Sequence, residues 1–119
     1  MTELSRGAEL FASRWLEKRG YEILERNFRT RRAEIDLIAV RDHVLAFVEV
    51  KFAGDGSTTR PLEKIDQGKI SRIVHASRAF LGQYDHHGEI RYDVAAVGGT
   101  GREYRMENYI EDAFRPDLF

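Results

Sequence analysis

Residues 34–51 have the sequence EIDLIAVRDHVLAFVEVK, in which two apolar runs are separated by a short polar break. Each run has the length and the β-branched content of a buried strand, and the break is typical of a hairpin turn. The first run nevertheless contains Asp36, and the second continues directly into Glu49 and Lys51. Because charged side chains are almost never fully buried unless they are paired or bind something, this hairpin indicates a site as well as a fold.

The relative positions of these three charges depend on the turn. A two-residue turn at Arg41-Asp42 places Asp36 opposite Phe47, with Glu49 on the diagonal of the same face. A four-residue loop places Asp36 directly opposite Glu49. In both cases Lys51 shares the face, because residues two apart on a strand point the same way. A three-residue loop would separate the two carboxylates, so the shared face depends on the turn.

Two neighbouring carboxylates are a ligand set for a hard divalent cation such as Mg²⁺, which binds through one or two carboxylates, waters and phosphate oxygens. Such a metal polarises a phosphate and generates hydroxide from bound water, and Lys51 could orient that water or balance the charge of the phosphate. This is the equipment for phosphodiester hydrolysis. The alternative is an ordinary ion pair of Lys51 with Glu49 or Asp36, since charged triplets are common in a chain that is 33% charged.

Two charged residues on predicted helices could join this site. Glu9 lies beside the apolar stripe of a helix expected at 3–19, from which it could reach the hairpin as a metal ligand or supporting group. It could equally be an ordinary glutamate at the boundary of the stripe. Lys69 lies on the buried stripe of a second helix, expected to run from Pro61 to Leu81. Its amine could point toward a phosphate or a carboxylate, or extend to solvent.

The whole chain fits one domain of mixed α/β structure with the order αβββαββ and a short C-terminal helix. We expect a five-stranded mixed sheet flanked by helices. Its strands are expected at 21–28, 34–40, 43–51, 90–97 and 102–107, a mobile loop at 53–59 and the C-terminal helix at 109–114. A chain of 119 residues is long enough to bury one real core.

Composition excludes several classes of function. The chain has no cysteine, which rules out disulfides, thiolate metal sites and cysteine nucleophiles. It contains no HExxH, P-loop, GxGxxG or G-x-S-x-G pattern, which argues against zinc proteases, nucleoside triphosphatases, dinucleotide-binding domains and α/β-hydrolases. No apolar run approaches the roughly 18 residues of a membrane span, and the N-terminus lacks the layout of a signal peptide. The expected location is therefore the cytoplasm, without a membrane partner.

A basic segment gives the chain a candidate surface for nucleic acid although the net charge is −1. Between residues 14 and 32 there are seven bases and three acids, and the bases at the end of this segment are Arg26, Arg29, Arg31 and Arg32. A local positive field of this kind can contact phosphates. The alternative is a solvated surface with unevenly distributed charge.

Several stretches together resemble the YraN-like family of bacterial proteins, over nearly the whole chain and in a specific order. They are Ala8-Glu9 with Ala12 and Trp15-Leu16, Gly20-Tyr21-Glu22-Ile23-Leu24-Glu25-Arg26-Asn27, Glu34-Ile35-Asp36-Leu37-Ile38, Phe47-Val48-Glu49-Val50-Lys51, Lys69, and Arg91-Tyr92-Asp93-Val94. That family looks like the restriction-endonuclease-like PD-(D/E)xK nuclease fold, with archaeal Holliday junction resolvases among its closest relatives.

The resemblance implies a role for each candidate residue. Asp36 and Glu49 would ligate Mg²⁺ or Mn²⁺, and Glu9 would assist the metal. Lys51 would serve the attacking water, and Lys69 would support phosphate binding.

The chain departs from the family at two positions beside the hairpin. Ala33 stands where the family usually has glycine, so local backbone freedom is lost there. Ile35, and not the proline that gives the superfamily its name, precedes the aspartate. Neither departure removes a charged group.

The residues and the resemblance together favour a metal-dependent endonuclease acting on DNA, on branched or damaged structures. One alternative is a nucleic-acid-binding module that retains the nuclease scaffold without its chemistry. Another is a scaffold that binds a protein partner. A homodimer would help to cut two strands symmetrically, although nothing in the sequence requires one.

Overall fold

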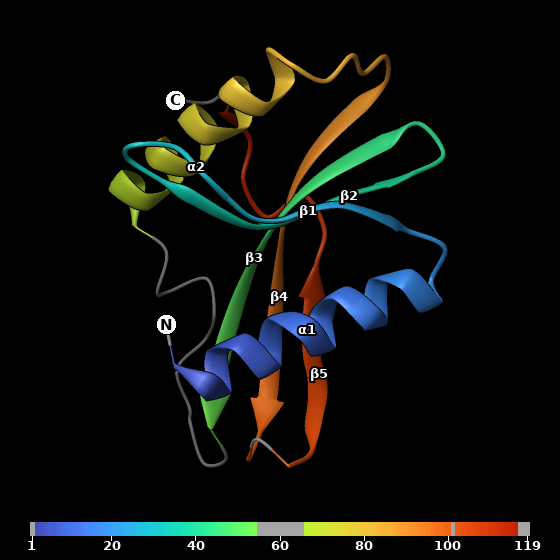
Figure 1. Cartoon of the computed structure of the whole chain (residues 1–119), viewed down its shortest axis with the longest axis vertical. Coiled ribbons are helices and arrows are strands. Elements are labelled where there is room, and N and C mark those ends of the chain that lie inside the picture. Colours follow the sequence, from blue (N-terminus) through green and yellow to red (C-terminus); the bar gives the residue numbers. More distant parts are fainter. Residues whose placement is uncertain (1, 55–65, 101, 117–119) are drawn as a thin grey trace.

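The computed structural model describes residues 2–54, 66–100 and 102–116, and within them the chain forms two helices and five strands. The elements are α1 (Glu3–Lys18), β1 (Glu22–Arg29), β2 (Glu34–Arg41), β3 (Val44–Gly54), α2 (Gln67–Leu81), β4 (Glu89–Gly99) and β5 (Tyr104–Ile110). The strands form one sheet in the order β1-β2-β3-β4-β5 (Figure 1). The central pair β3 and β4 is parallel and the other neighbours are antiparallel, which confirms the expected mixed sheet and element order.

The hairpin of β2 and β3 has one of the two registers that the sequence allowed. Leu37 pairs with Val48 and Arg41 with Val44, so the turn consists of residues 42 and 43. The turn expected at Arg41-Asp42 therefore lies one residue later. Asp42 has a φ of 54°, a conformation that two-residue hairpin turns require and that aspartate tolerates. If the pairing of Leu37 with Val48 is continued by one residue, Asp36 lies directly opposite Glu49.

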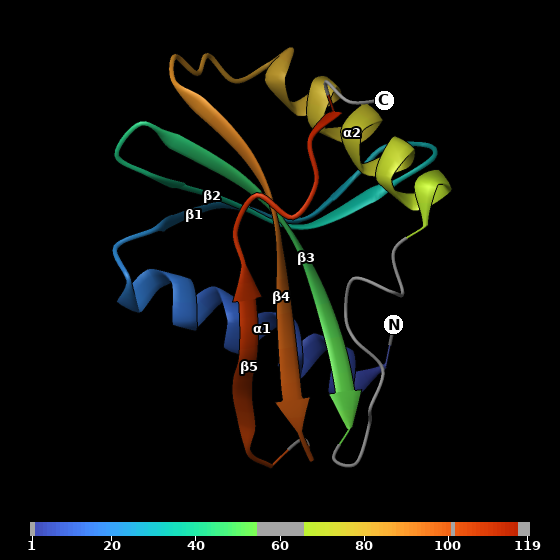
Figure 2. The same ribbon diagram turned by 180° about the vertical axis from the view of Figure 1, so that it is seen from behind.

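The two helices cover opposite faces of the sheet, as Figures 1 and 2 show from opposite sides. Small and aliphatic side chains form the core on the α1 face, namely Ala8, Ala12, Leu16, Tyr21, Leu37, Ala39, Ala46, Val48, Ala95 and Val97. Larger side chains form the core on the α2 face, namely Ile35, Ile38, Leu45, Phe47, Ile73, Val74, Ala76, Phe80 and Tyr92. Residues of β3 alternate between these cores, so Glu49 and Lys51 belong by position to the α2 face.

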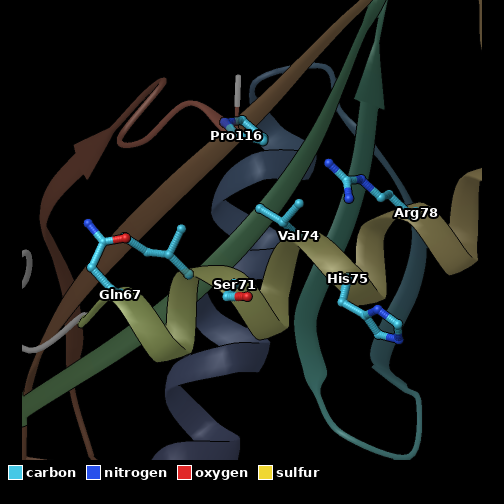
Figure 3. A pocket seen from close by; sticks show the side chains of 7 residues that line it. Gln67, Ser71, Val74, His75, Arg78 and Pro116 are labelled. Carbon is cyan, nitrogen blue, oxygen red and sulfur yellow. The ribbon is translucent and has the colours of Figure 1, made fainter. Parts of the chain in front are cut away.

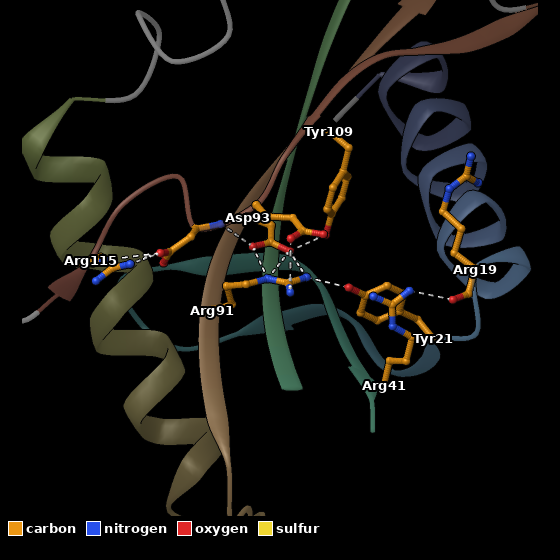
Figure 4. A network of polar contacts seen from close by, with 9 residues as sticks. Arg19, Tyr21, Arg41, Arg91, Asp93, Tyr109 and Arg115 are labelled. Carbon is orange, nitrogen blue, oxygen red and sulfur yellow. Dashed lines mark hydrogen bonds and ion pairs between the residues drawn. The ribbon is translucent and has the colours of Figure 1, made fainter. Parts of the chain in front are cut away.

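A buried polar network joins Tyr21, just before β1, to the start of β4 and the end of β5 (Figure 4). Arg91 donates to both carboxylate oxygens of Asp93, a residue that is fully buried, and also donates to the Tyr21 hydroxyl. The Tyr109 hydroxyl donates to Asp93 over 2.6 Å, and the backbone N–H of Asp112 donates over 2.9 Å. These bonds satisfy the buried carboxylate. Asp93 pairs with Val48, one residue before Glu49, so the network lies close to the acidic residues of the hairpin along the sheet but on the α1 face, whereas Glu49 belongs to the α2 face.

The start of one expected helix is wrong, and another expected helix does not form. The second helix begins at Gln67, because Asp66 is extended and its side chain accepts a hydrogen bond from the Lys69 N–H as an N-cap. Pro61, where we expected that helix to start, lies outside the described residues. The helix expected at 109–114 does not form, since β5 continues through Ile110 and is followed by a turn.

Smaller differences concern the strand ends. Strand β3 continues through Ala53 to Gly54, which we expected to begin a loop, and the rest of that loop lies outside the described residues. Strand β5 begins at Tyr104, two residues later than expected. Neither described helix is both long and apolar enough to cross a membrane.

Candidate functional site

A cleft of about 400 Å³ lies where β2 and β3 meet the N-terminal halves of α1 and α2. It is lined by Ser5, Glu9, Glu34, Asp36, Glu49, Val50, Lys51, Phe52 and Lys69. Three of the five charged residues that the sequence indicated come from the hairpin, one from α1 and one from α2. The structure therefore brings Glu9, Asp36, Glu49, Lys51 and Lys69 together in one place.

Asp36 and Glu49 form the acidic centre of the cleft. One oxygen of Asp36, Oδ2, accepts a hydrogen bond of 2.7 Å from the backbone N–H of Val50, which fixes the carboxyl against β3. Burial, and then the charge of Glu49, raise the pKa of Asp36 to about 8. Glu49 itself is only 6% exposed. The negative charge of Glu49 therefore makes ionisation of the neighbouring Asp36 less favourable.

Two lysines converge on the same oxygen of Glu49. The ammonium of Lys69 lies 2.8 Å from Glu49 Oε1, and that of Lys51 lies 3.5 Å from it. Burial, and then the neighbouring Lys69, lower the pKa of Lys51. Burial alone would lower the pKa of Lys69 as well, but its hydrogen bonds to Glu49 and Lys51 raise it. Lys69 is thus the cation that neutralises Glu49, and Lys51 is the amine that gives up its proton more readily.

Glu9 lies at the edge of the acidic centre, together with two residues that sequence reasoning missed. With its amide nitrogen facing the carboxylates, Asn27 donates to Glu9 Oε1 at 2.8 Å and to Glu34 Oε1 at 2.7 Å. Burial, and then the charge of Glu34, raise the pKa of Glu9 to about 6. Asn27 therefore holds two carboxylates from different elements beside Asp36 and Glu49.

An irregularity in the sheet allows both helices to contribute to this cleft. Ile35 packs in the core of the α2 face and Leu37 in the core of the α1 face, although strand residues two apart normally share a face. Asn27, which lies opposite Asp36 between two paired positions of β1, has a φ of 53°. Asparagine is among the few residues that adopt a positive φ readily. In the sequence, the residue type at position 27 is the only indication of this irregularity in β1.

The arginines predicted to bind nucleic acid lie outside the cleft and differ in their contacts. Arg26 donates to the Ser13 hydroxyl of α1 at 3.0 Å, and Arg29 forms an ion pair of 3.5 Å with Glu34. Arg31 and Arg32 are exposed in the turn between β1 and β2. Two of the four arginines thus support the fold around the site, and two remain directed to solvent.

The acidic centre fits a metal held by two carboxylates better than a cage of protein ligands. Within the described part of the chain, no three Asp, Glu or His side chains are placed to hold a metal ion together. Mg²⁺, however, commonly binds through one or two carboxylates and retains several waters. Asp36 Oδ1 accepts no hydrogen bond from the described residues, and both Asp36 and Glu49 line the open cleft. Their mutual repulsion is the kind of electrostatic cost that a divalent cation removes.

Comparison with known proteins gives a single family. The model of Uncharacterised protein family UPF0102 matches residues 8–97, which include every residue of the acidic centre and both lysines. A UPF0102 protein of Prosthecochloris aestuarii is 41% identical over 94% of this chain and 93% of its own length. A UPF0102 protein of Bacteroides thetaiotaomicron is 34% identical over 98% of this chain and 96% of its own length. The chain therefore belongs to Uncharacterised protein family UPF0102.

Proposed function

We propose that this protein is a metal-dependent nuclease of the restriction-endonuclease-like PD-(D/E)xK type, which hydrolyses phosphodiester bonds of DNA. The observation that carries the proposal is the cleft in which Asp36 and Glu49 face each other with Lys51 and Lys69 beside them. Two carboxylates and a lysine at the end of a buried hairpin are the groups that such hydrolysis requires. The sequence resemblance to that nuclease type supports the same assignment.

Asp36 and Glu49 would hold Mg²⁺ or Mn²⁺, and Glu9 would assist from α1. The metal, when bound, supplies charge stabilisation at the phosphate and lowers the pKa of a coordinated water. Lys69 already contacts Glu49, and a bound phosphate would give its ammonium a second anionic partner. Lys51 would orient the attacking water and accept its proton, a role for which its lowered pKa is suited.

Hydrolysis by these groups adds one water molecule across a P–O ester bond. The water oxygen forms the new bond to phosphorus, and the ester oxygen leaves with a proton as a free hydroxyl. The products are one strand end with a phosphomonoester and one with a hydroxyl, and neither an oxidant nor a nucleotide is consumed.

The experiment that tests the proposal is cleavage of labelled single-stranded, duplex, flap, fork and four-way-junction DNA with Mg²⁺ or Mn²⁺. Wild type and the variants Glu49→Gln and Glu49→Ala would be compared, with circular dichroism to confirm that each is folded. We expect the variants to lose cleavage by a factor of about 100 or more, because a single electrostatic or general-base group contributes roughly that much. Full cleavage by either variant would contradict the assignment.

One observation favours a second candidate, a nucleic-acid-binding module without catalysis. Lys69 forms a close ion pair with Glu49, and in the described residues no third acidic ligand converges with Asp36 and Glu49. In that case the lysines would take the place of a metal as the counter-charge of the acidic centre. The same panel distinguishes the two, because this candidate gives binding that weakens with salt and no product with any divalent metal.

A further inference from the structure

The helix that supplies Lys69 carries only positive charges. Between Gln67 and Leu81 there is no Asp or Glu, although the whole chain has 20 acidic residues. The charged and titratable residues of α2 recur at every third position, as Lys69, Arg72, His75 and Arg78. We call these four residues the basic ridge. The ridge begins in the candidate active site, because Lys69 lines the cleft.

The geometry of an α-helix turns this spacing into a continuous path. Residues three apart are surface neighbours, and a row of them winds obliquely across the helix. At a rise of 1.5 Å per residue, the nine steps from Lys69 to Arg78 cover about 14 Å along the helix axis. Because one strand of a DNA duplex carries a phosphate per 3.4 Å of rise, the ridge spans roughly four phosphates.

The outer members of the ridge are available to a ligand. Arg72, His75 and Arg78 are exposed. None of these three side chains forms an ion pair with a carboxylate of the described residues. Arg29, by contrast, forms an ion pair with Glu34, and Arg26 donates a hydrogen bond to the Ser13 hydroxyl.

A shallow pocket lies along α2 from Gln67 to Arg78 and includes the last two residues of the ridge (Figure 3). It has a volume of about 280 Å³ and is lined by Gln67, Ile70, Ser71, Val74, His75, Arg78 and Pro116. Its polar side chains are an amide, a hydroxyl, an imidazole and a guanidinium, and none of its described lining residues carries a carboxylate. Phosphate oxygens accept hydrogen bonds from all four kinds of group.

We propose that the basic ridge of α2 is the surface that binds the phosphate backbone of the nucleic acid, from the cleft at Lys69 to the pocket at Arg78. This inference rests on the proposed function, because it identifies the substrate of that site as a polyanionic strand several phosphates long. The inference is supported by charge complementarity, because the helix has no acidic residue and the nucleic-acid strand is negatively charged. The ridge, rather than the arginines of the β1–β2 turn, then contributes most to affinity.

The test is binding of a fluorescent 20-base-pair duplex, followed by anisotropy in EDTA over a range of KCl concentrations. The ridge variant is Arg72→Ala/Arg78→Ala, and the matched control Arg31→Ala/Arg32→Ala removes the same two charges from the turn. Each phosphate contact accounts for about 0.9 in the slope of log affinity against log salt. We expect the ridge variant to lower that slope by about 1.8 and to weaken binding at least tenfold at 0.1 M salt, by roughly the counterion release of two contacts.

The control variant should change binding less than the ridge variant does. Unchanged affinity and slope in the ridge variant, or no binding of nucleic acid by the wild type, would overturn the inference. Its failure is distinguishable from failure of the proposed function, because binding in EDTA requires no hydrolysis. A wild type that binds through the ridge and cleaves nothing would contradict the nuclease alone.

Discussion

At the scale of single residues, the acidic centre depends on carboxyls that the fold makes difficult to ionise. The pKa of Asp36 is raised to about 8 and that of Glu9 to about 6, both chiefly by burial. In the unfolded chain both groups ionise near pH 4. The folded protein therefore binds these protons more tightly than the unfolded chain does, and without metal its stability falls as the pH rises from about 4 to about 8.

This reasoning predicts that Asp36→Asn removes much of the pH dependence of stability. In EDTA at pH 8.5, the variant should have a free energy of unfolding higher than that of the wild type by more than about 1.4 kcal/mol, the equivalent of one pKa unit. At pH 4 the two proteins should be nearly equally stable. Urea unfolding at several pH values measures the difference, and Asp85→Asn, at an exposed position, is the matched control. A variant with the same pH profile as the wild type would refute the account.

The residues of the cleft differ in how far the sequence could predict them. The shared position of Asp36, Glu49 and Lys51 could be predicted. With a hairpin turn of two or of four residues, the two-residue period of a strand places all three on one face. Asn27 and Glu34 could not, because their position depends on a positive φ within β1 and on the interrupted alternation at Asp36. Neither feature leaves a periodic signal.

At the scale of elements, the sequence could predict each helix and strand of the sheet but not where some of them end. The second helix lacks a visible start in its apolar pattern, and the Asp66 cap that begins it is a local hydrogen bond. The sequence predicts a helix at 109–114, whereas Tyr109 and Ile110 belong to β5. Their pairing with Ala95 and Val94 of β4 is a long-range contact, which a local pattern does not contain.

We expect the network of Arg91 and Asp93 to contribute strongly to the free energy of unfolding. Asp93→Ala should lower the free energy of unfolding by about 3 kcal/mol or more, because it leaves the buried Arg91 without its main partner. Asp85→Ala, which breaks an exposed pair with His87, should change stability by less than about 0.5 kcal/mol. Urea unfolding at pH 7 compares the two. Equal effects would mean that the buried network contributes no more than a surface pair.

At the scale of the whole molecule, two groups of polar residues lie close to each other along the sheet but differ in how their charges are balanced. The Arg91–Asp93 network has its hydrogen bonds satisfied by Tyr21, Tyr109 and the backbone of Asp112, and it joins β4 to β5 on the α1 face of the sheet. The cleft has two raised carboxyl pKa values, those of Asp36 and Glu9, and one carboxylate oxygen without a described partner. The first network is balanced within the protein, whereas in the cleft the lysines pair with Glu49 and the proposed divalent cation would offset the remaining charge of Asp36.

Addition of a divalent metal should therefore stabilise the whole domain. A ligand that binds only the folded state raises the free energy of unfolding by about 2.7 kcal/mol at one hundred times its dissociation constant. We expect Mn²⁺ or Mg²⁺ to raise the thermal midpoint of the wild type by several degrees at pH 8.5. The shift should be smaller at pH 6, because protons compete for Asp36 there.

The variant Asp36→Asn separates this effect from general ionic stabilisation. It keeps a side-chain oxygen for the Val50 N–H but removes the negative charge that the metal requires. Its thermal midpoint should not respond to Mn²⁺ beyond the shift that an equal ionic strength of KCl produces, whereas Asp85→Asn should respond as the wild type does. An equal metal-dependent shift in wild type and Asp36→Asn would place the metal elsewhere in the molecule, and the cleft would then lose its main chemical argument for hydrolysis.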